Sequence, residues 1–91
     1  MPLEKNLETA CKRIADKEGA VWLKIERRKG WPDRILMVRG RYCWCELKTA
    51  RGKLSPMQVY VHNLLRYAGA RVTVVRSAAR LKRLIQGMIR E

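Results

Sequence analysis

The chain has 91 residues, of which 47% are hydrophobic and 32% are charged, and its formal net charge is +13. This length predicts a single domain over residues 1–91, and the hydrophobic fraction excludes global disorder. No apolar run reaches the roughly 18 residues of a membrane span and no signal-peptide core precedes the first helix, so we expect a soluble, intracellular protein.

The first part of the chain predicts one helix and one strand. Apolar residues recur at helical spacing over residues 3–18, and Gly19 follows as a plausible cap. Aromatic and β-branched residues then predict a strand over residues 20–26. The basic segment 27–32 contains Gly and Pro and is expected to form a turn.

The middle of the chain predicts a β-hairpin. Residues 33–38 and 42–48 each have the composition of a strand. The three residues between them, Arg-Gly-Arg at 39–41, suit a tight turn.

The last part predicts a helix, a short strand and a final helix. Ser55 can cap a helix over residues 56–68, and Ser77 can cap a helix over residues 78–89. The apolar segment 70–75 between them reads as a strand. The two helices have apolar stripes that we expect to face inward, at Met57, Tyr60, Val61, Leu64, Leu65 and Ala68 and at Leu81, Leu84, Ile85, Met88 and Ile89. The second stripe suits either packing on the sheet or a dimer interface.

The resulting order of elements is α-β-β-β-α-β-α. A hairpin followed by a strand–helix–strand crossover predicts a mixed sheet with helices packed on it, which is an α/β sandwich.

The three cysteines, Cys11, Cys43 and Cys45, do not suggest a disulfide framework. An odd count that includes a C-x-C pair fits a reducing compartment, and the single histidine, His62, leaves too few ligands for a zinc site. We expect reduced and mostly buried thiols.

Two acids and a lysine stand out in this basic chain. Alternation along the third strand places Glu46 and Lys48 on one face, and Asp33 begins the strand before it. Carboxylate oxygens are ligands that Mg²⁺ prefers, and a lysine can stabilise charge that develops on a phosphate. Taken singly, Asp33 reads as a turn residue and the other two as an exposed ion pair. Together they favour metal-assisted hydrolysis of a phosphodiester.

These residues also resemble a known family. Pro-Asp at 32–33, twelve further residues and Glu-Leu-Lys at 46–48 are similar to the PD-(D/E)XK nuclease signature. The segments "GWPDRIL", "CELKTARGKLSPMQ" and "RYAGARVTVVRS" resemble the virus-type replication-repair nuclease (VRR-NUC) family of that superfamily, over residues from about 7 to 77. The resemblance implies the restriction-endonuclease-like α-β-β-β-α-β core, here with an extra C-terminal helix.

The resemblance also implies roles for individual residues. Asp33 and Glu46 match the metal-binding acids, Lys48 matches the catalytic lysine, and the backbone carbonyl of Leu47 completes the metal shell. Gln58 matches a glutamine beside the active site. Glu8 matches an acid of the first helix that faces the metal, and Glu4, one turn earlier, is the alternative. His62 lies one turn after Gln58, but it is left outside the catalytic set because the lysine already fills that role.

The positive charge predicts nucleic acid as the partner, because each neutralised phosphate releases counterions. General solubilising charge and an anionic membrane surface are alternatives, and the second is weakened because no single amphipathic helix dominates. The residues that we expect to contact phosphates flank the acids: Lys24, Arg27, Arg28, Lys29, Arg34 and Lys53. Trp31 is a candidate for stacking on a base, whereas Trp22 and Trp44 are expected to pack in the core.

The leading hypothesis is a Mg²⁺- or Mn²⁺-dependent DNA endonuclease that acts on branched DNA. The resemblance implies cleavage of Holliday junctions by a homodimer in the bacterial cytoplasm, with an origin in a phage or mobile element. A non-catalytic nucleic-acid-binding protein on the same fold is the main alternative. A basic domain associated with RNA or the ribosome is the third.

Overall fold

A computed structural model describes residues 2–26 and 28–91 of the chain, with side chains from Lys5 onward. The elements follow one another as α1 (Pro2–Lys17), β1 (Val21–Lys24), β2 (Arg34–Val38), β3 (Arg41–Leu47), α2 (Pro56–Tyr67), β4 (Val72–Val75) and α3 (Ala78–Arg90). This is the predicted order, and the bounds differ from the predicted ones by no more than three residues at any end. None of the described helices is long and apolar enough to cross a membrane.

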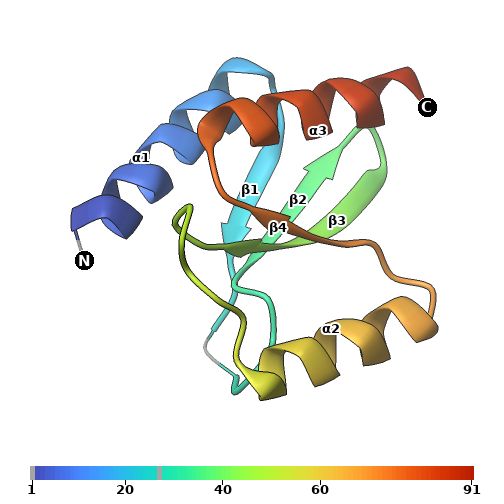
Figure 1. The fold of residues 1–91 in the computed structure, drawn as a ribbon. Coiled ribbons are helices and arrows are strands. Elements are labelled where there is room, and N and C mark those ends of the chain that lie inside the picture. Colours follow the sequence, from blue (N-terminus) through green and yellow to red (C-terminus); the bar gives the residue numbers. More distant parts are fainter. Residues whose placement is uncertain (1, 27) are drawn as a thin grey trace.

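The four strands form one mixed sheet in the order β1-β2-β3-β4. The β1–β2 and β2–β3 pairs are antiparallel, whereas β3 and β4 are parallel because α2 crosses over between them. Helices α1 and α3 lie together over one face of the sheet, and α2 lies on the opposite side (Figure 1). The structure therefore confirms an α/β fold with a mixed sheet.

The β2–β3 hairpin closes through a two-residue turn. Arg39 and Gly40 both have positive φ, at 52° and 78°. Such turns twist in the sense that flanking strands require, and glycine adopts this φ without a steric cost. The turn holds the two strands in the register that places the acids.

The hydrophobic core lies between the sheet and the α1–α3 layer. Its residues alternate along the strands and meet the inner sides of the two helices: Cys11, Leu36, Val38, Cys43, Cys45, Leu47, Val75, Leu81, Ile85 and Met88. All three cysteines are free and buried, as expected, and burial raises the pKa of the Cys11 thiol to about 11. The stripe of α3 thus packs on the sheet.

Helix α2 differs from its prediction in how little it buries. Only Val61 and His62 of this helix are buried, whereas Met57, Tyr60 and Leu64 of the predicted inward stripe are 40%, 63% and 49% exposed. Helix α2 packs mainly along β4 and touches the end of β3 through Gln58 and His62, which leaves much of its apolar stripe uncovered.

Candidate active site

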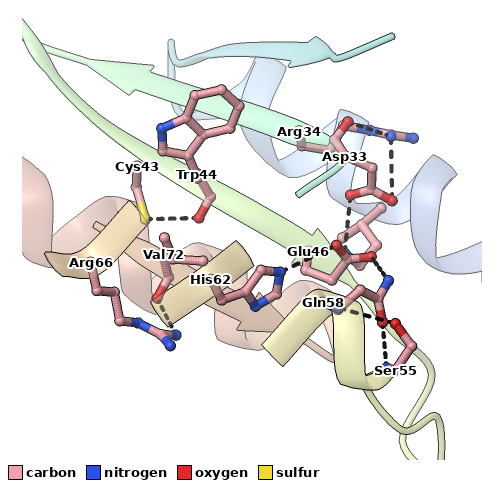
Figure 2. A network of polar contacts seen from close by, with 11 residues as sticks. Asp33, Arg34, Cys43, Trp44, Glu46, Ser55, Gln58, His62, Arg66 and Val72 are labelled. Carbon is pink, nitrogen blue, oxygen red and sulfur yellow. Dashed lines mark hydrogen bonds and ion pairs between the residues drawn. The ribbon is translucent and has the colours of Figure 1, made fainter. Parts of the chain in front are cut away.

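The strand register brings Asp33 and Glu46 together at one end of the sheet. Arg34 of β2 pairs with Cys45 of β3, and one further step of this antiparallel register sets Asp33 opposite Glu46. Side chains alternate along a strand, so both carboxylates belong to the face that α2 approaches, whereas Arg34 belongs to the other face. Acids that are thirteen positions apart in the sequence are therefore cross-strand neighbours (Figure 2).

Asp33 is held in place by the backbone of both neighbouring strands. The Leu47 amide N–H donates to Oδ1 of Asp33 at 3.2 Å. On the other side, the carbonyl of Asp33 accepts from the amide of Ile25 at 2.9 Å. The carboxylate is 38% exposed and lies beside the peptide of Leu47, the residue whose carbonyl is the third expected metal ligand.

The loop that carries Asp33 is seated directly against α2 at Gly30. A Cβ at this position would lie 2.5 Å from Cγ of Met57 and 2.8 Å from the Met57 carbonyl oxygen. The φ of Gly30 is +82°, a conformation that L side chains rarely adopt. Glycine is required here on both counts, and its absence of a side chain sets how near the Asp33 loop comes to α2.

The next residue, Trp31, is packed rather than free. Its ring meets Trp44 edge to face with centroids 5.7 Å apart, and the Arg28 guanidinium lies 5.2 Å from the centroid of the Trp31 ring. Trp31 and Trp44 are both half-buried. These contacts favour a structural role for Trp31, which joins the loop to β3, over the expected stacking on a base.

Glu46 is almost completely buried and is oriented from α2. Nε2 of Gln58 donates to Oε2 of Glu46 at 3.4 Å (Figure 2). Gln58 is itself fixed by a capping box. Its side-chain Oε1 accepts from the backbone N–H of Ser55 at 2.8 Å, and its backbone N–H donates to Oγ of Ser55 at 3.1 Å. The helix cap thus places the side-chain amide of Gln58 against the Glu46 carboxylate.

His62 contacts Glu46 one helical turn further along α2. Its Nε2 lies 3.7 Å from Oε1 of Glu46, and neither ring nitrogen has a hydrogen-bond partner among the described residues. Burial lowers the pKa of His62, and the nearby cations Arg66 and Lys48 lower it further. The contact is therefore one between a neutral imidazole and a carboxylate, not an ion pair.

Lys48 follows directly after β3 and lines the same hollow as the two acids. Its amide donates to the Val75 carbonyl at 3.1 Å, which extends the parallel pairing by one residue. The loop after it is clamped by Arg76, whose Nη1 donates to the carbonyls of Thr49 and Gly52 at 2.8 and 2.7 Å. The backbone that carries the lysine is thus anchored on both sides.

Glu8 reaches the site from α1 and is bound by Arg34. Nη2 of Arg34 donates to Oε1 of Glu8 at 2.8 Å, and the Arg34 side chain is only 7% exposed. A buried guanidinium that is bound to a carboxylate is not available to a phosphate, so its burial does not support the expected nucleic-acid contact of Arg34. The side chain of Glu4, the alternative acid, lies outside the described residues.

A hollow of about 700 Å³ opens in front of the acids. Its lining contains the three residues of the signature, Leu47 and Gln58, together with Glu8 and several basic residues. Lys24, Arg28 and Lys29 of the expected phosphate contacts line it, whereas Lys53 is exposed on the loop outside it. Arg27 lies outside the described residues. Basic side chains and four carboxylates, those of Glu8, Glu26, Asp33 and Glu46, therefore line one hollow.

The donor set suits a hard divalent cation. Asp33, Glu46 and Leu47 line one hollow, and the Leu47 amide binds Oδ1 of Asp33. Mg²⁺ and Mn²⁺ prefer carboxylate and carbonyl oxygens and keep several of their waters. Among the side chains that the structure describes, no group of three or more His, Cys, Asp or Glu residues is arranged to hold a metal ion. The residues that would hold such an ion are the ones that the resemblance implies, namely Asp33, Glu46 and the carbonyl of Leu47.

Two contacts of this site were not expected from the sequence. The sequence interpretation leaves His62 outside the catalytic set. Its spacing of four from Gln58 is nevertheless the signal that both side chains face Glu46. The pairing of Glu8 with Arg34 spans 26 residues and joins a helix to a strand, and no local pattern points to it.

The fold and this arrangement of acids define a nuclease-like α/β protein of the PD-(D/E)XK type. A solved structure of a VRR-NUC domain matches the chain with a TM-score of 0.75 and 30% sequence identity, covering 91% of this chain and 94% of that one. No protein-family model matches the sequence, and no curated protein matches it either. The identity and coverage of the structural match show that the chain belongs to the VRR-NUC family, which confirms the resemblance read from its residues.

Proposed function

We propose that this chain is a metal-dependent DNA endonuclease that hydrolyses phosphodiester bonds in branched DNA, with the Holliday junction as its substrate and 5′-phosphate ends as products. The observation that carries the proposal is the pairing of Asp33 and Glu46 across the β2–β3 register, with Lys48 beside them in a hollow lined by basic residues. We further propose that it acts in the bacterial cytoplasm as a homodimer of one domain and derives from a phage or mobile element.

The chemistry follows from the residues around the hollow. Asp33, Glu46 and the Leu47 carbonyl would hold a divalent ion, which would supply Lewis acidity and a bound water of lowered pKa. Lys48 places a positive charge where negative charge develops on the phosphate, and it orients the attacking water. Gln58 holds Glu46 in one orientation, so that the carboxylate needs no rearrangement when substrate arrives.

The electrostatics of the chain suit a phosphate backbone. The net charge is +13, and Lys24, Arg28 and Lys29 line the hollow next to the acids. A second hollow of about 410 Å³ shares Glu8, Lys24 and Arg34 with the first and adds Lys12 and Arg13 of α1. Because Arg34 is bound to Glu8, the cations that this hollow offers to a phosphate are Lys24, Lys12 and Arg13. Together the two hollows form a basic path that leads DNA to the carboxylates.

The exposed apolar surface supports the homodimer. Val21, Leu23, Met37 and Tyr42 belong to the sheet face that α2 leaves uncovered, and each is at least 38% exposed. The outer side of α2 adds Met57, Val59, Tyr60, Leu64 and Tyr67, and these nine residues together are called the apolar surface here. Arg66 is the only Lys, Arg, Asp or Glu within Pro56–Tyr67. Two chains of charge +13 can therefore meet on this surface with little repulsion between like charges.

A cleavage assay tests the proposal. Labelled four-way junction, flap, single-stranded and plain duplex DNA are incubated with the protein and with Mg²⁺, Mn²⁺ or EDTA. We expect cutting of branched DNA that EDTA abolishes, and loss of cutting in Asp33→Asn and in Lys48→Ala while binding persists. Glu18→Gln and Lys82→Ala are the control variants, because each removes a charge at a residue that lines neither hollow.

The alternatives give different results in the same assay. If Asp33→Asn and Lys48→Ala cut as well as the controls, the site assignment is wrong. If DNA binds but no substrate is cut with either metal, the chain is a nucleic-acid-binding protein on a nuclease fold. Cutting of plain duplex as fast as of the four-way junction contradicts the structure-selective part of the proposal.

A further inference from the structure

Arg34 is a buried cation between two acids of the candidate site. Its Nη2 donates to Oε1 of Glu8 at 2.8 Å, its Nη1 donates to the backbone carbonyl of Asp33 at 3.0 Å, and Nη1 lies 3.8 Å from Oδ2 of Asp33. One guanidinium thus links an acid of α1 to the acid that begins the hairpin. Arg34 also lines both hollows, so the link lies at their junction.

The position of Arg34 in β2 explains this reach. Its pairing with Cys45 and Lys24 places its side chain on the α1 face of the sheet, whereas Asp33, one residue earlier, belongs to the α2 face. The long Arg34 side chain bends back beyond the start of β2 and reaches Asp33, the residue that precedes it in the sequence. Because a guanidinium in a protein keeps its proton, the charge beside Asp33 is permanent.

We propose that Arg34 takes the place of a second divalent ion at this centre. In this arrangement Glu8 serves to hold Arg34, and a single ion binds between Asp33, Glu46 and the carbonyl of Leu47. The proposal rests on the metal-dependent function proposed above. It assigns to Glu8 a role as the anchor of an arginine, in place of the metal-ligand role that the resemblance implies.

Electrostatics favour this assignment. A second divalent ion that bridged Glu8 and Asp33 would lie against the Arg34 guanidinium, which is only 7% exposed, so the two like charges would repel each other. Solvent screens part of this repulsion, because the Glu8 and Asp33 side chains are 40% and 38% exposed. Oε1 of Glu8 already accepts from the guanidinium. The guanidinium neutralises negative charge on Glu8 and Asp33 that a second ion would otherwise neutralise.

Arg34 is also a positioning residue for Asp33. The Leu47 amide binds Oδ1 of the carboxylate, and the guanidinium lies on the side of Oδ2. These two contacts favour one orientation of the Asp33 carboxylate before any ion binds.

Titration calorimetry of the full chain with Mn²⁺, in the absence of DNA, tests the proposal. We expect one ion per chain. Glu8→Gln keeps an oxygen that accepts from Arg34, so its stoichiometry stays at one and its Kd changes by no more than about twofold. Asp33→Asn removes a ligand and weakens the Kd about tenfold or more.

Two variants of Arg34 test the role of its charge. Arg34→Met removes the cation at similar length and leaves two acids near each other, so we expect a second Mn²⁺ to bind. Arg34→Lys keeps the charge and stays at one ion per chain. A gain in stoichiometry cannot arise from partial unfolding, and if Arg34→Met does not fold, Glu8→Gln still decides the question.

The outcomes separate the inference from the function on which it rests. Two ions in the wild-type chain, a loss of affinity in Glu8→Gln as large as that in Asp33→Asn, or a single ion in a folded Arg34→Met chain each overturns the inference alone. A wild-type chain that binds no Mn²⁺ overturns the inference and the metal dependence of the proposed function together.

Discussion

Nε2 of His62 lies 3.7 Å from Oε1 of Glu46, and both side chains are almost completely buried, at 1% and 6% exposed. Burial and two nearby cations lower the pKa of His62, so at pH 7 a neutral imidazole faces the Glu46 carboxylate. With Gln58 on the other oxygen, α2 contributes two contacts that orient one acid of the candidate site.

His62→Leu is expected to lower the rate of DNA cleavage about tenfold if Glu46 holds a metal ion as proposed, because side chains that orient a metal-binding carboxylate are worth about that much. The fold should persist, since an apolar side chain of similar size fills the same buried space. His62→Gln keeps a polar side chain beside Glu46 and should recover most of the rate. Single-turnover cleavage of the preferred substrate measures both. Wild-type cleavage by His62→Leu would show that the contact is only packing.

Gly30→Ala is expected to lower the free energy of unfolding by about 2–3 kcal/mol, since it adds a clash with Met57 to the cost of a positive φ. Gly19→Ala is the matched control. Gly19 also has a positive φ, +74°, but a Cβ there meets nothing within 4 Å, so only about 1 kcal/mol is expected. Urea denaturation measures both variants. Equal losses of unfolding free energy in the two variants would show that the loop carrying Asp33 can move away from α2 at no cost.

Ser55→Ala and Ser77→Ala each remove the side chain that caps a helix, which costs about 1 kcal/mol of stability. Only the cap at Ser55 holds the turn that carries Gln58. We therefore expect Ser55→Ala to lower the cleavage rate at a temperature where both variants are fully folded, and Ser77→Ala to leave it unchanged. The same loss of rate in both variants would argue against a specific role for this capping box.

The Glu91 carboxylate predicts a pH dependence of stability. Arg71 donates to both carboxylate oxygens of Glu91 through Nη1 and Nη2, with 2.8 Å between Nη1 and Oε2. Nε of Arg41 lies 3.2 Å from Oε1 of Glu91. The hydrogen bonds from Arg71 hold the pKa of Glu91 below its usual value. A lowered pKa means that the stabilisation is complete above 4.5, the usual value, and is lost as the pH falls through the folded value.

Glu91→Gln is therefore expected to lower the Tm slightly at pH 7, with the difference from wild type vanishing at acidic pH. The effect is small because the group is exposed, and high salt should reduce it. Thermal scans of both proteins across this pH range measure it. A difference that stays constant down to acidic pH would assign the effect to packing in place of charge.

The apolar surface predicts the site of self-association. Tyr60→Lys and Leu64→Lys place a charge on the outer side of α2, where like charges would then meet across a two-fold interface, so we expect monomers. Ala79→Lys is the matched control, since it adds the same charge to an exposed position of α3. Light scattering coupled to size exclusion measures the mass. A dimer that persists in both α2 variants would place the interface elsewhere.

Local sequence determined much of this protein. Alternation along a strand, the turn at Arg39–Gly40 and the caps at Ser55 and Ser77 depend on residues a few positions apart, so the order of elements, the hairpin and the helix starts were all predictable. The same alternation placed Glu46 on its face, and the hairpin register then set Asp33 opposite it.

Only the tertiary structure decided which distant side chains meet at these acids. The pairing of Glu8 with Arg34 depends on how α1 lies over the sheet, and the contact of His62 with Glu46 depends on how α2 lies beneath it. The exposure of Tyr60 and Leu64 depends on that same placement, because a periodic apolar stripe looks alike whether it faces a core or solvent. Spacing along the chain fixes the direction of a side chain within its element, and packing between elements fixes what that side chain touches.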